Sequence, residues 1–153
     1  MLGKRIDPMT LPKTKAWRAA MNDKLSLWDY LAIEGGLTLA LAFAELFWPR
    51  FVEVRGCIVL AEHYQPDNFE TWWEQLGGDN EKIERTINHL HLWDVFEPAK
   101  EGVPDDALLQ LAEVLAGGWR AALSQQFPGK AITVEVSTET EDYGPTLTVF
   151  AKR

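Results

Sequence analysis

The stretch Ala131-Ile-Thr-Val-Glu-Val136, followed by Thr146-Leu-Thr-Val-Phe-Ala151, decides the fold class of this chain. In both segments apolar residues alternate with polar or smaller ones, which is the period of a β-strand. The nine residues 137–145 join the two segments and hold a Gly-Pro pair. We therefore predict an antiparallel hairpin with strands at about 131–136 and 146–151.

A helix is predicted immediately before this hairpin. It begins near Asp105, and an apolar stripe from Leu108 to Leu123 keeps one helical face over four turns. Gly117-Gly118 interrupts the middle of the stripe, and each glycine costs about 1 kcal/mol relative to alanine in a helix. The doublet therefore predicts either close packing of another element or a kink.

Two further helices are predicted nearer the N-terminus. Ser26 and Asp29 have the spacing of an N-terminal cap, and Gly35-Gly36 ends that helix, glycine being suited to a left-handed cap. Leu37–Trp48 is apolar nearly all round, which predicts a central, buried helix. Its 12 residues are fewer than the roughly 20 that a membrane span needs, so we predict no membrane segment.

The middle of the chain predicts one strand and more helix. Phe51–Ala61 is rich in β-branched and apolar residues, with Gly56 as a candidate bulge. Asp79 caps a helix that we expect to run to about Phe96, because Ile83 begins an apolar stripe with helical spacing. The complete pattern predicts an α+β fold: a small, mainly antiparallel sheet covered by four or five helices.

We expect one domain over residues 13–153, preceded by a flexible lead-in at 1–12. The lead-in holds two prolines among charged residues, and Met9 is an alternative start to Met1. Its first residues have charge and proline where a secretory signal would be apolar. Cys57 is the only cysteine, which excludes an intramolecular disulfide and predicts a buried, unreactive thiol. These features predict a cytoplasmic protein.

Charge narrows the classes of partner. The chain has 23 acidic and 15 basic residues, a formal net charge of −8. Residues 1–61 carry a net charge of +2 and residues 62–153 carry −10. Because nucleic-acid binding depends on cations that displace phosphate counterions, this balance argues against it.

Catalytic candidates are few. His89 and His91 lie two apart, and on a helix such residues point about 200° apart, so we predict no metal site and no cofactor. His91 and Asp94 are three apart and fit either an oriented general base or a surface pair. No phosphate-binding loop or metalloprotease motif is present in the sequence.

Glu45 is the most unusual acid, because it interrupts an apolar helix. A buried, unpaired carboxylate there would have a raised pKa and suit acid–base chemistry. The alternatives, which we favour, are that one face of this helix reaches solvent or that Arg50 or Arg55 neutralises the carboxylate. Together with His63, His91 and Asp94, Glu45 forms a weak candidate set for a small hydrolase-type enzyme.

The best candidates for a binding surface are aromatic and acidic. Trp72 and Trp73 are adjacent, and neighbours on a helix point about 100° apart, so either one is exposed or both wedge between layers. An exposed tryptophan beside Glu70 and Glu74 would resemble an interface hot spot. The partner-binding candidates are Trp72, Trp73, Glu70 and Glu74, with Glu139, Glu141, Asp142 and Tyr143 of the hairpin loop.

We therefore expect a non-enzymatic soluble binding protein whose acidic C-terminal half docks a basic protein partner. A small, acidic, tryptophan-rich chain without catalytic motifs is typical of immunity proteins that neutralise basic nuclease toxins, although no family motif supports this analogy. One alternative is a self-associating structural subunit whose apolar helices supply the surface. The second alternative is the small enzyme built on the candidate set above.

Overall fold

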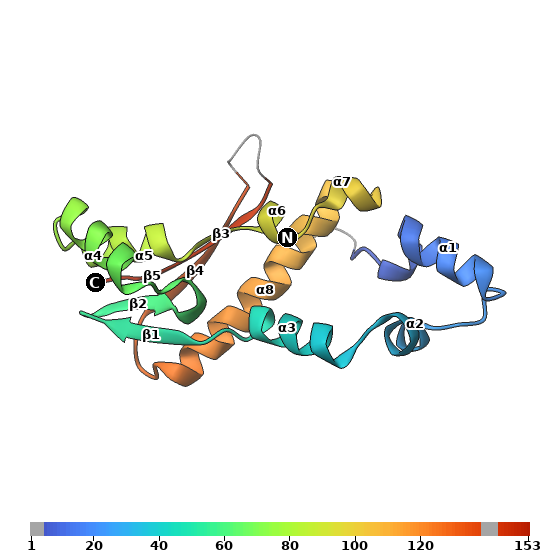
Figure 1. Cartoon of the computed structure of the whole chain (residues 1–153), viewed down its shortest axis with the longest axis horizontal. Helices are drawn as coiled ribbons and strands as arrows, with labels where there is room; N and C mark the ends of the chain where they lie inside the picture. Colours follow the sequence, from blue (N-terminus) through green and yellow to red (C-terminus); the bar gives the residue numbers. More distant parts are fainter. Residues whose placement is uncertain (1–4, 139–143) are drawn as a thin grey trace.

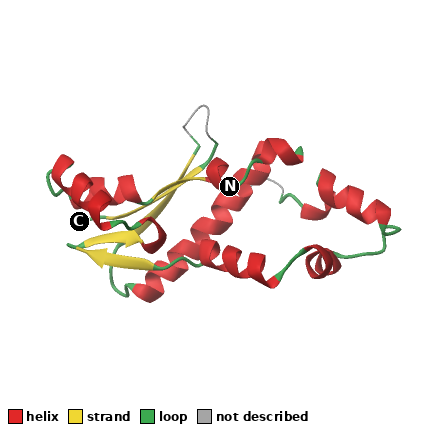
Figure 2. Ribbon diagram, in the orientation of Figure 1, coloured by secondary structure: helices red, strands yellow, loops and turns green. Residues whose placement is uncertain are grey.

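The computed structural model describes residues 5–138 and 144–153, and it has the predicted α+β fold. Strands gather at one end of an elongated molecule, and the first helices lie at the other end (Figures 1 and 2). The elements are α1 (Pro12–Ala20), α2 (Leu27–Glu34), α3 (Leu37–Phe47), β1 (Phe51–Val54), β2 (Cys57–Leu60), α4 (Pro66–Gln75), α5 (Asn80–Ile87), β3 (His89–His91), α6 (Leu92–Val95), α7 (Pro98–Glu101), α8 (Asp105–Gln126), β4 (Ile132–Ser137) and β5 (Thr146–Ala151), with short 3₁₀ turns at Pro8–Thr10 and Ala61–His63.

The predicted C-terminal hairpin is confirmed. β4 and β5 pair in an antiparallel register that runs from Ile132 opposite Ala151 to Ser137 opposite Thr146. β5 is the central strand of its sheet, because β3 pairs with its other edge. All six residues of β5 are buried, including its two threonines, so this strand is enclosed on both faces.

The prediction of one strand over residues 51–61 is wrong. β1 and β2 are two strands of a separate antiparallel hairpin, with Phe51 opposite Leu60. Arg55 and Gly56 form the connection and both have positive φ, 50° and 78°. Two consecutive positive φ values suit the right-handed twist of a tight hairpin. The described residues thus form two small antiparallel sheets instead of one.

The predicted helix from Asp79 to Phe96 is also wrong in its second half. Asp79 does cap α5, accepting a hydrogen bond from the Lys82 amide, but the helix ends at Ile87. His89-Leu90-His91 then forms β3, paired with residues 146–148 of β5. The free edge of β5 supplies backbone hydrogen bonds that local helical periodicity does not reveal.

The principal core forms where α8 packs against both sheets. Its buried members include Leu115 and Trp119 of α8, Ile58 of β2 and Val149 of β5, so the predicted apolar stripe of α8 is confirmed. Close packing, the first of the two expectations for Gly117-Gly118, is confirmed at Gly118. A Cβ there would lie 2.3 Å from the Phe47 carbonyl oxygen at the end of α3.

Two buried polar side chains, Glu84 of α5 and Asn88 at its C-terminal cap, join the two sheets. Glu84 is fully buried and accepts hydrogen bonds from the amides of Ile58 in β2 and Ala151 in β5, both at 2.8 Å. Asn88, one turn later, accepts from the Leu60 amide at 2.8 Å and donates to the carbonyls of Ile58 and Val149. These side chains satisfy strand edges that do not pair with each other.

Candidate functional site

Glu45 is not buried within its apolar helix. Its side chain is 71% exposed on α3, and its carboxylate lies 3.9 Å from the Arg50 guanidinium. An exposed pair of this kind contributes little to stability. The structure therefore agrees with the favoured alternatives, a helix face that reaches solvent and pairing with Arg50, and not with a buried carboxylate for acid–base catalysis.

The other catalytic candidates lie on separate elements. His63 closes the 3₁₀ turn before α4, with its Nδ1 3.0 Å from the Ile87 carbonyl oxygen. His91 ends β3, and Asp94 is exposed on α6. None of these residues lines the apolar cavity that lies between residues 5–11 and α8. Within residues 5–138 and 144–153, no group of three or more histidine, cysteine or acidic side chains is placed to hold a metal ion.

His89 and His91 form a pair that sequence reasoning excluded. They lie on β3, where residues two apart share a face, and their rings meet edge to face at 4.6 Å. The expectation that the two histidines point apart is wrong, because the segment is a strand and not a helix. His89 Nδ1 also lies 2.8 Å from the Thr148 hydroxyl. Burial, and then the neighbouring His91, lower the pKa of His89.

This pKa predicts a loss of stability in acid. Unfolded histidine titrates near about 6.5, and the folded pKa of His89 lies below its ordinary value. The contribution of neutral His89 is therefore complete above about pH 6.5 and is lost as the pH falls through the folded pKa. We expect His89→Gln to lose less thermal stability than the wild type between about pH 7 and pH 5. Melting curves across this range check it, and parallel curves for the two proteins would contradict it.

Trp72 and Trp73 are both half-buried, as the wedged alternative predicts. They pack against a second, smaller core around Cys57, Val59 and Phe69, and the ring of Trp73 stacks on Phe69 at 5.9 Å. Cys57 is fully buried, and burial raises the pKa of its thiol to about 11, in agreement with an unreactive cysteine.

The acidic candidates beside these tryptophans are exposed on α4. Glu70 pairs with Arg55 at 2.8 Å, and the Arg55 guanidinium also lies 5.0 Å from the centre of the Trp73 ring. Glu74 lies one turn further along the same helix. Glu139, Glu141, Asp142 and Tyr143 fall outside the residues that the structure describes.

The largest exposed apolar surface lies on α2 and α3. We call residues 27–48 the α2–α3 arm. Every residue from 31 to 45 is exposed, although this segment forms two regular helices. Its large exposed apolar side chains are Trp28 and Leu37, at 78% and 77%, with Leu31, Ile33, Leu39, Leu41, Phe43 and Trp48. The prediction that Leu37–Trp48 is a central, buried helix is wrong, because only its last turn reaches the core.

The arm is nevertheless held in place. Ser26 and Asp29 form the predicted capping box at the start of α2, whereas Gly35 ends it in extended backbone instead of the predicted left-handed cap. Trp17 of α1 meets Tyr30 of α2 edge to face at 5.0 Å. At the other end Trp119 of α8 donates its indole hydrogen bond to the Leu46 carbonyl at 2.8 Å. The exposed helices are thus fixed at both ends.

The segment before α1 also contacts α8. Residues 5–12 belong to the predicted lead-in, and here the Ile6 backbone makes two hydrogen bonds with the Gln110 side chain of α8. Met9 is buried. Residues 1–4 lie outside the described part of the chain.

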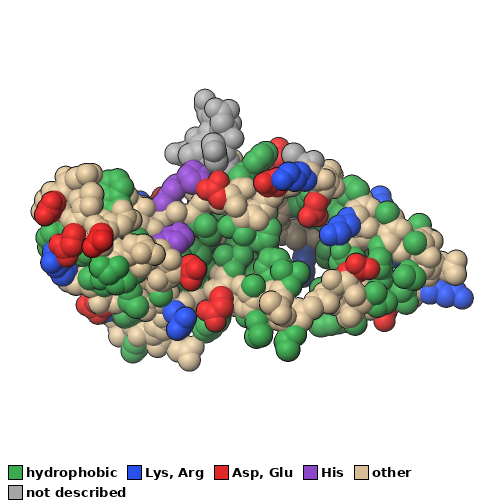
Figure 3. Space-filling view, viewed as in Figure 1, with side chains coloured by type: hydrophobic (Ala, Val, Ile, Leu, Met, Phe, Trp, Pro, Cys, Tyr) green, Lys and Arg blue, Asp and Glu red, His purple; other side chains and the backbone are tan. Residues whose placement is uncertain are grey.

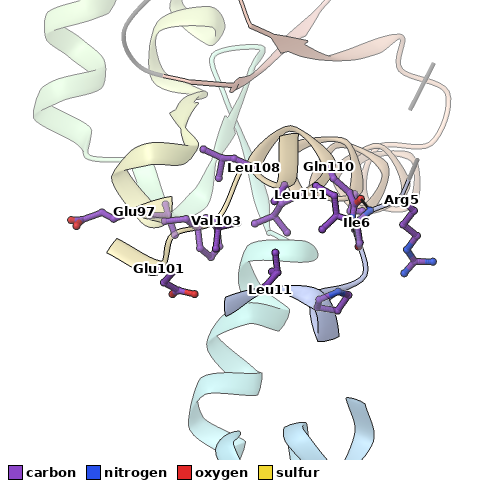
Figure 4. A pocket seen from close by; sticks show the side chains of 14 residues that line it. Arg5, Ile6, Leu11, Glu97, Glu101, Val103, Leu108, Gln110 and Leu111 are labelled. Carbon is purple, nitrogen blue, oxygen red and sulfur yellow. Dashed lines mark hydrogen bonds between the residues drawn. The ribbon is translucent and has the colours of Figure 1, made fainter. Parts of the chain in front are cut away.

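An open apolar cavity of about 420 Å³ lies between this segment and α6, α7 and α8. Figure 4 shows Leu11, Val103 and Leu111 around it, with Glu97 and Glu101 on one side. Val95 and Val114 line the cavity and are about half exposed. Phe96, a further lining residue, stacks on Phe43 of α3 at 6.1 Å. Apolar surface therefore continues from the cavity onto the arm, and hydrophobic side chains gather over the middle of the molecule (Figure 3).

Across the described residues, no individual helix is long and apolar enough to cross a membrane. The helices α2 and α3 together have sufficient length and apolar character, but they are bent by 114° relative to each other.

Comparison with known proteins found no matching family model, no matching curated protein and no matching solved structure.

Proposed function

We propose that the protein is a non-enzymatic binding protein and that the α2–α3 arm is its principal docking surface. The observation that carries the proposal is the run of fifteen consecutive exposed residues, 31–45, on two well-formed apolar helices. Contact between water and such an apolar surface is unfavourable, so a docked protein that removes this water stabilises the arm.

The size of the surface supports the same conclusion. A fully exposed large apolar side chain presents about 200 Å². Multiplied by the exposed fractions of the eight large apolar side chains of the arm, this gives on the order of 900 Å² of exposed apolar surface. The largest apolar patch on a typical monomer is about 300–600 Å². The capping box and the two anchored ends indicate that the helices are preformed, which lowers the entropic cost of docking.

A photo-crosslinking amino acid at Leu37 tests this proposal in living cells. Leu37 is 77% exposed, so the substitution perturbs no packed side chain. We expect discrete covalent adducts at Leu37 and none with the same probe at Gln125, an exposed polar position near the end of α8. Recovery of only the uncrosslinked chain from both variants would overturn the proposal.

The acidic face of α4 supports a second docking site, for a basic protein. Asp67, Glu70 and Glu74 are exposed at helical spacing beside the half-buried Trp72 and Trp73. Such a surface steers and selects a cationic partner, as an immunity protein requires. This second site belongs to the acidic half of the chain and is separate from the arm. We place the protein in the reducing cytoplasm, where the lone Cys57 stays a thiol.

A further inference from the structure

The arm is exposed on more than one side. The residues of α3 from Leu37 to Glu45 are all exposed, and before its last turn the helix is partly covered only on the side where Phe43 stacks on Phe96. A flat surface such as a bilayer covers one side of a helix of this kind. Complete burial requires a partner that contacts opposite sides of the helix at once.

The surface beside α3 is apolar and concave. We call it the apolar groove, formed by Val95, Phe96, Leu111 and Val114 of the cavity and by Phe43 of α3. A helix of 11 residues is about 16 Å long, and an apolar helix laid in this groove would contact both the groove wall and α3. The occupant must itself be a short helix that is apolar on opposite faces.

α3 meets this requirement, since it combines an all-round apolar surface with a position at the edge of the groove. A surface that carries both the helix and its receptor is self-complementary, which is the property of a two-fold interface. The exposed apolar area of the arm, on the order of 900 Å², also matches the roughly 800 Å² per partner of a stable interface.

The acidic helix α4 lies away from the proposed interface. The net charge of −10 belongs to residues 62–153, which include the acidic α4, whereas residues 1–61 carry +2. The arm and α4 lie toward different ends of the elongated molecule (Figure 1). Two copies that meet through their arms keep their α4 helices apart, and the acidic groups near the interface are Glu45 of the arm and Glu97 and Glu101 of the cavity.

We infer that the partner of the α2–α3 arm is a second copy of this chain, with α3 of each copy lying in the apolar groove of the other. The inference rests on the proposed function and names its partner. Each groove is completed by a helix from the other copy, so the interface is reciprocal.

Light scattering during size-exclusion chromatography tests the inference on the full chain. We expect a particle of twice 17.3 kDa at micromolar concentration. Leu41→Glu changes the inserted helix and Val114→Glu changes the groove wall; both positions are more than half exposed within one chain. Each should weaken dimerisation by about 30-fold or more, the effect of losing an interface hot spot. Gln125→Glu, the matched control, should remain a dimer.

Circular dichroism confirms that each variant is folded, and two variants on different elements keep the test independent of one failure to fold. A monomeric wild type, or a dimer that Val114→Glu leaves intact, would overturn the inference. Flotation of a monomer with phosphatidylglycerol vesicles would overturn it too, because the arm would then bind lipid. A Leu37 crosslink to a different protein would overturn the second copy as partner while leaving the proposed function in place.

Discussion

Glu84→Ala is expected to lower the free energy of unfolding by about 2–6 kcal/mol, because two buried backbone amides lose their acceptor. The Glu84 carboxylate is fully buried and accepts from the amides of Ile58 and Ala151 and from the Arg153 guanidinium at 2.9 Å. Alanine leaves both amides without their acceptor, and a buried unsatisfied amide costs about 1–3 kcal/mol. Because the amides belong to different sheets, the substitution removes one of the two side-chain links between β2 and β5 and leaves that of Asn88.

Urea unfolding followed by circular dichroism measures this effect. Glu81→Ala is the matched control, because Glu81 lies on the same helix and pairs with Arg85 at 3.0 Å, but both side chains are partly exposed. An exposed pair of this kind is worth about 0–1 kcal/mol. Equal losses for the two variants would contradict the assignment of Glu84 as a connection between the sheets.

Gly118→Ala is expected to destabilise the protein by about 1–3 kcal/mol, the usual range for overpacking. An added Cβ would lie 2.3 Å from the Phe47 carbonyl oxygen, a backbone atom that moves only if the end of α3 moves. That movement also strains the hydrogen bond from Trp119 to the Leu46 carbonyl. The penalty exceeds the roughly 1 kcal/mol that alanine gains over glycine in a helix.

Gly117→Ala provides the control for this substitution. A Cβ at Gly117 meets no atom within 4 Å, so the same change one residue earlier should stabilise the helix by up to about 1 kcal/mol. Thermal unfolding of the two variants should therefore give shifts of opposite sign. A stabilised Gly118→Ala variant would show that α3 does not pack closely on α8 at this point.

Local signals in the sequence were sufficient for several elements. Ser26 and Asp29 predicted the start of α2, and the alternation around Val134 predicted the C-terminal hairpin. The Gly117-Gly118 doublet predicted a close approach, which occurs at Gly118. The cap and the strand alternation depend on neighbouring residues alone. Gly118 lacks a side chain because the approaching backbone of α3 leaves no room for one.

Features decided by distant residues could not be predicted in this way. β3 forms because β5 offers it a free edge, and local periodicity around Leu90 favoured a helix. Arg55 adopts a left-handed conformation that non-glycine residues seldom adopt. The Arg55-Gly56 pair is therefore not a sequence signal that predicts a two-residue hairpin turn.

The candidate site failed for a related reason. An apolar helix such as α3 has the same sequence pattern whether its own core or another molecule covers it. The pairing of His89 with His91 followed from the missed strand. The catalytic reading of Glu45 failed with the assumption that its helix is buried.

The central place of β5 has a consequence for the synthesis of the chain. β3, Glu84 and Asn88 all bind β5, a strand that is synthesised about 60 residues later. At about 5–20 residues per second, this delay lasts roughly 3–12 s on the ribosome. During that interval β2, β3 and the carboxylate of Glu84 have no partner from β5, so the nascent chain exposes unpaired strand edges. Folding of the sheet formed by β3, β5 and β4 is thus a late event that is timed by translation.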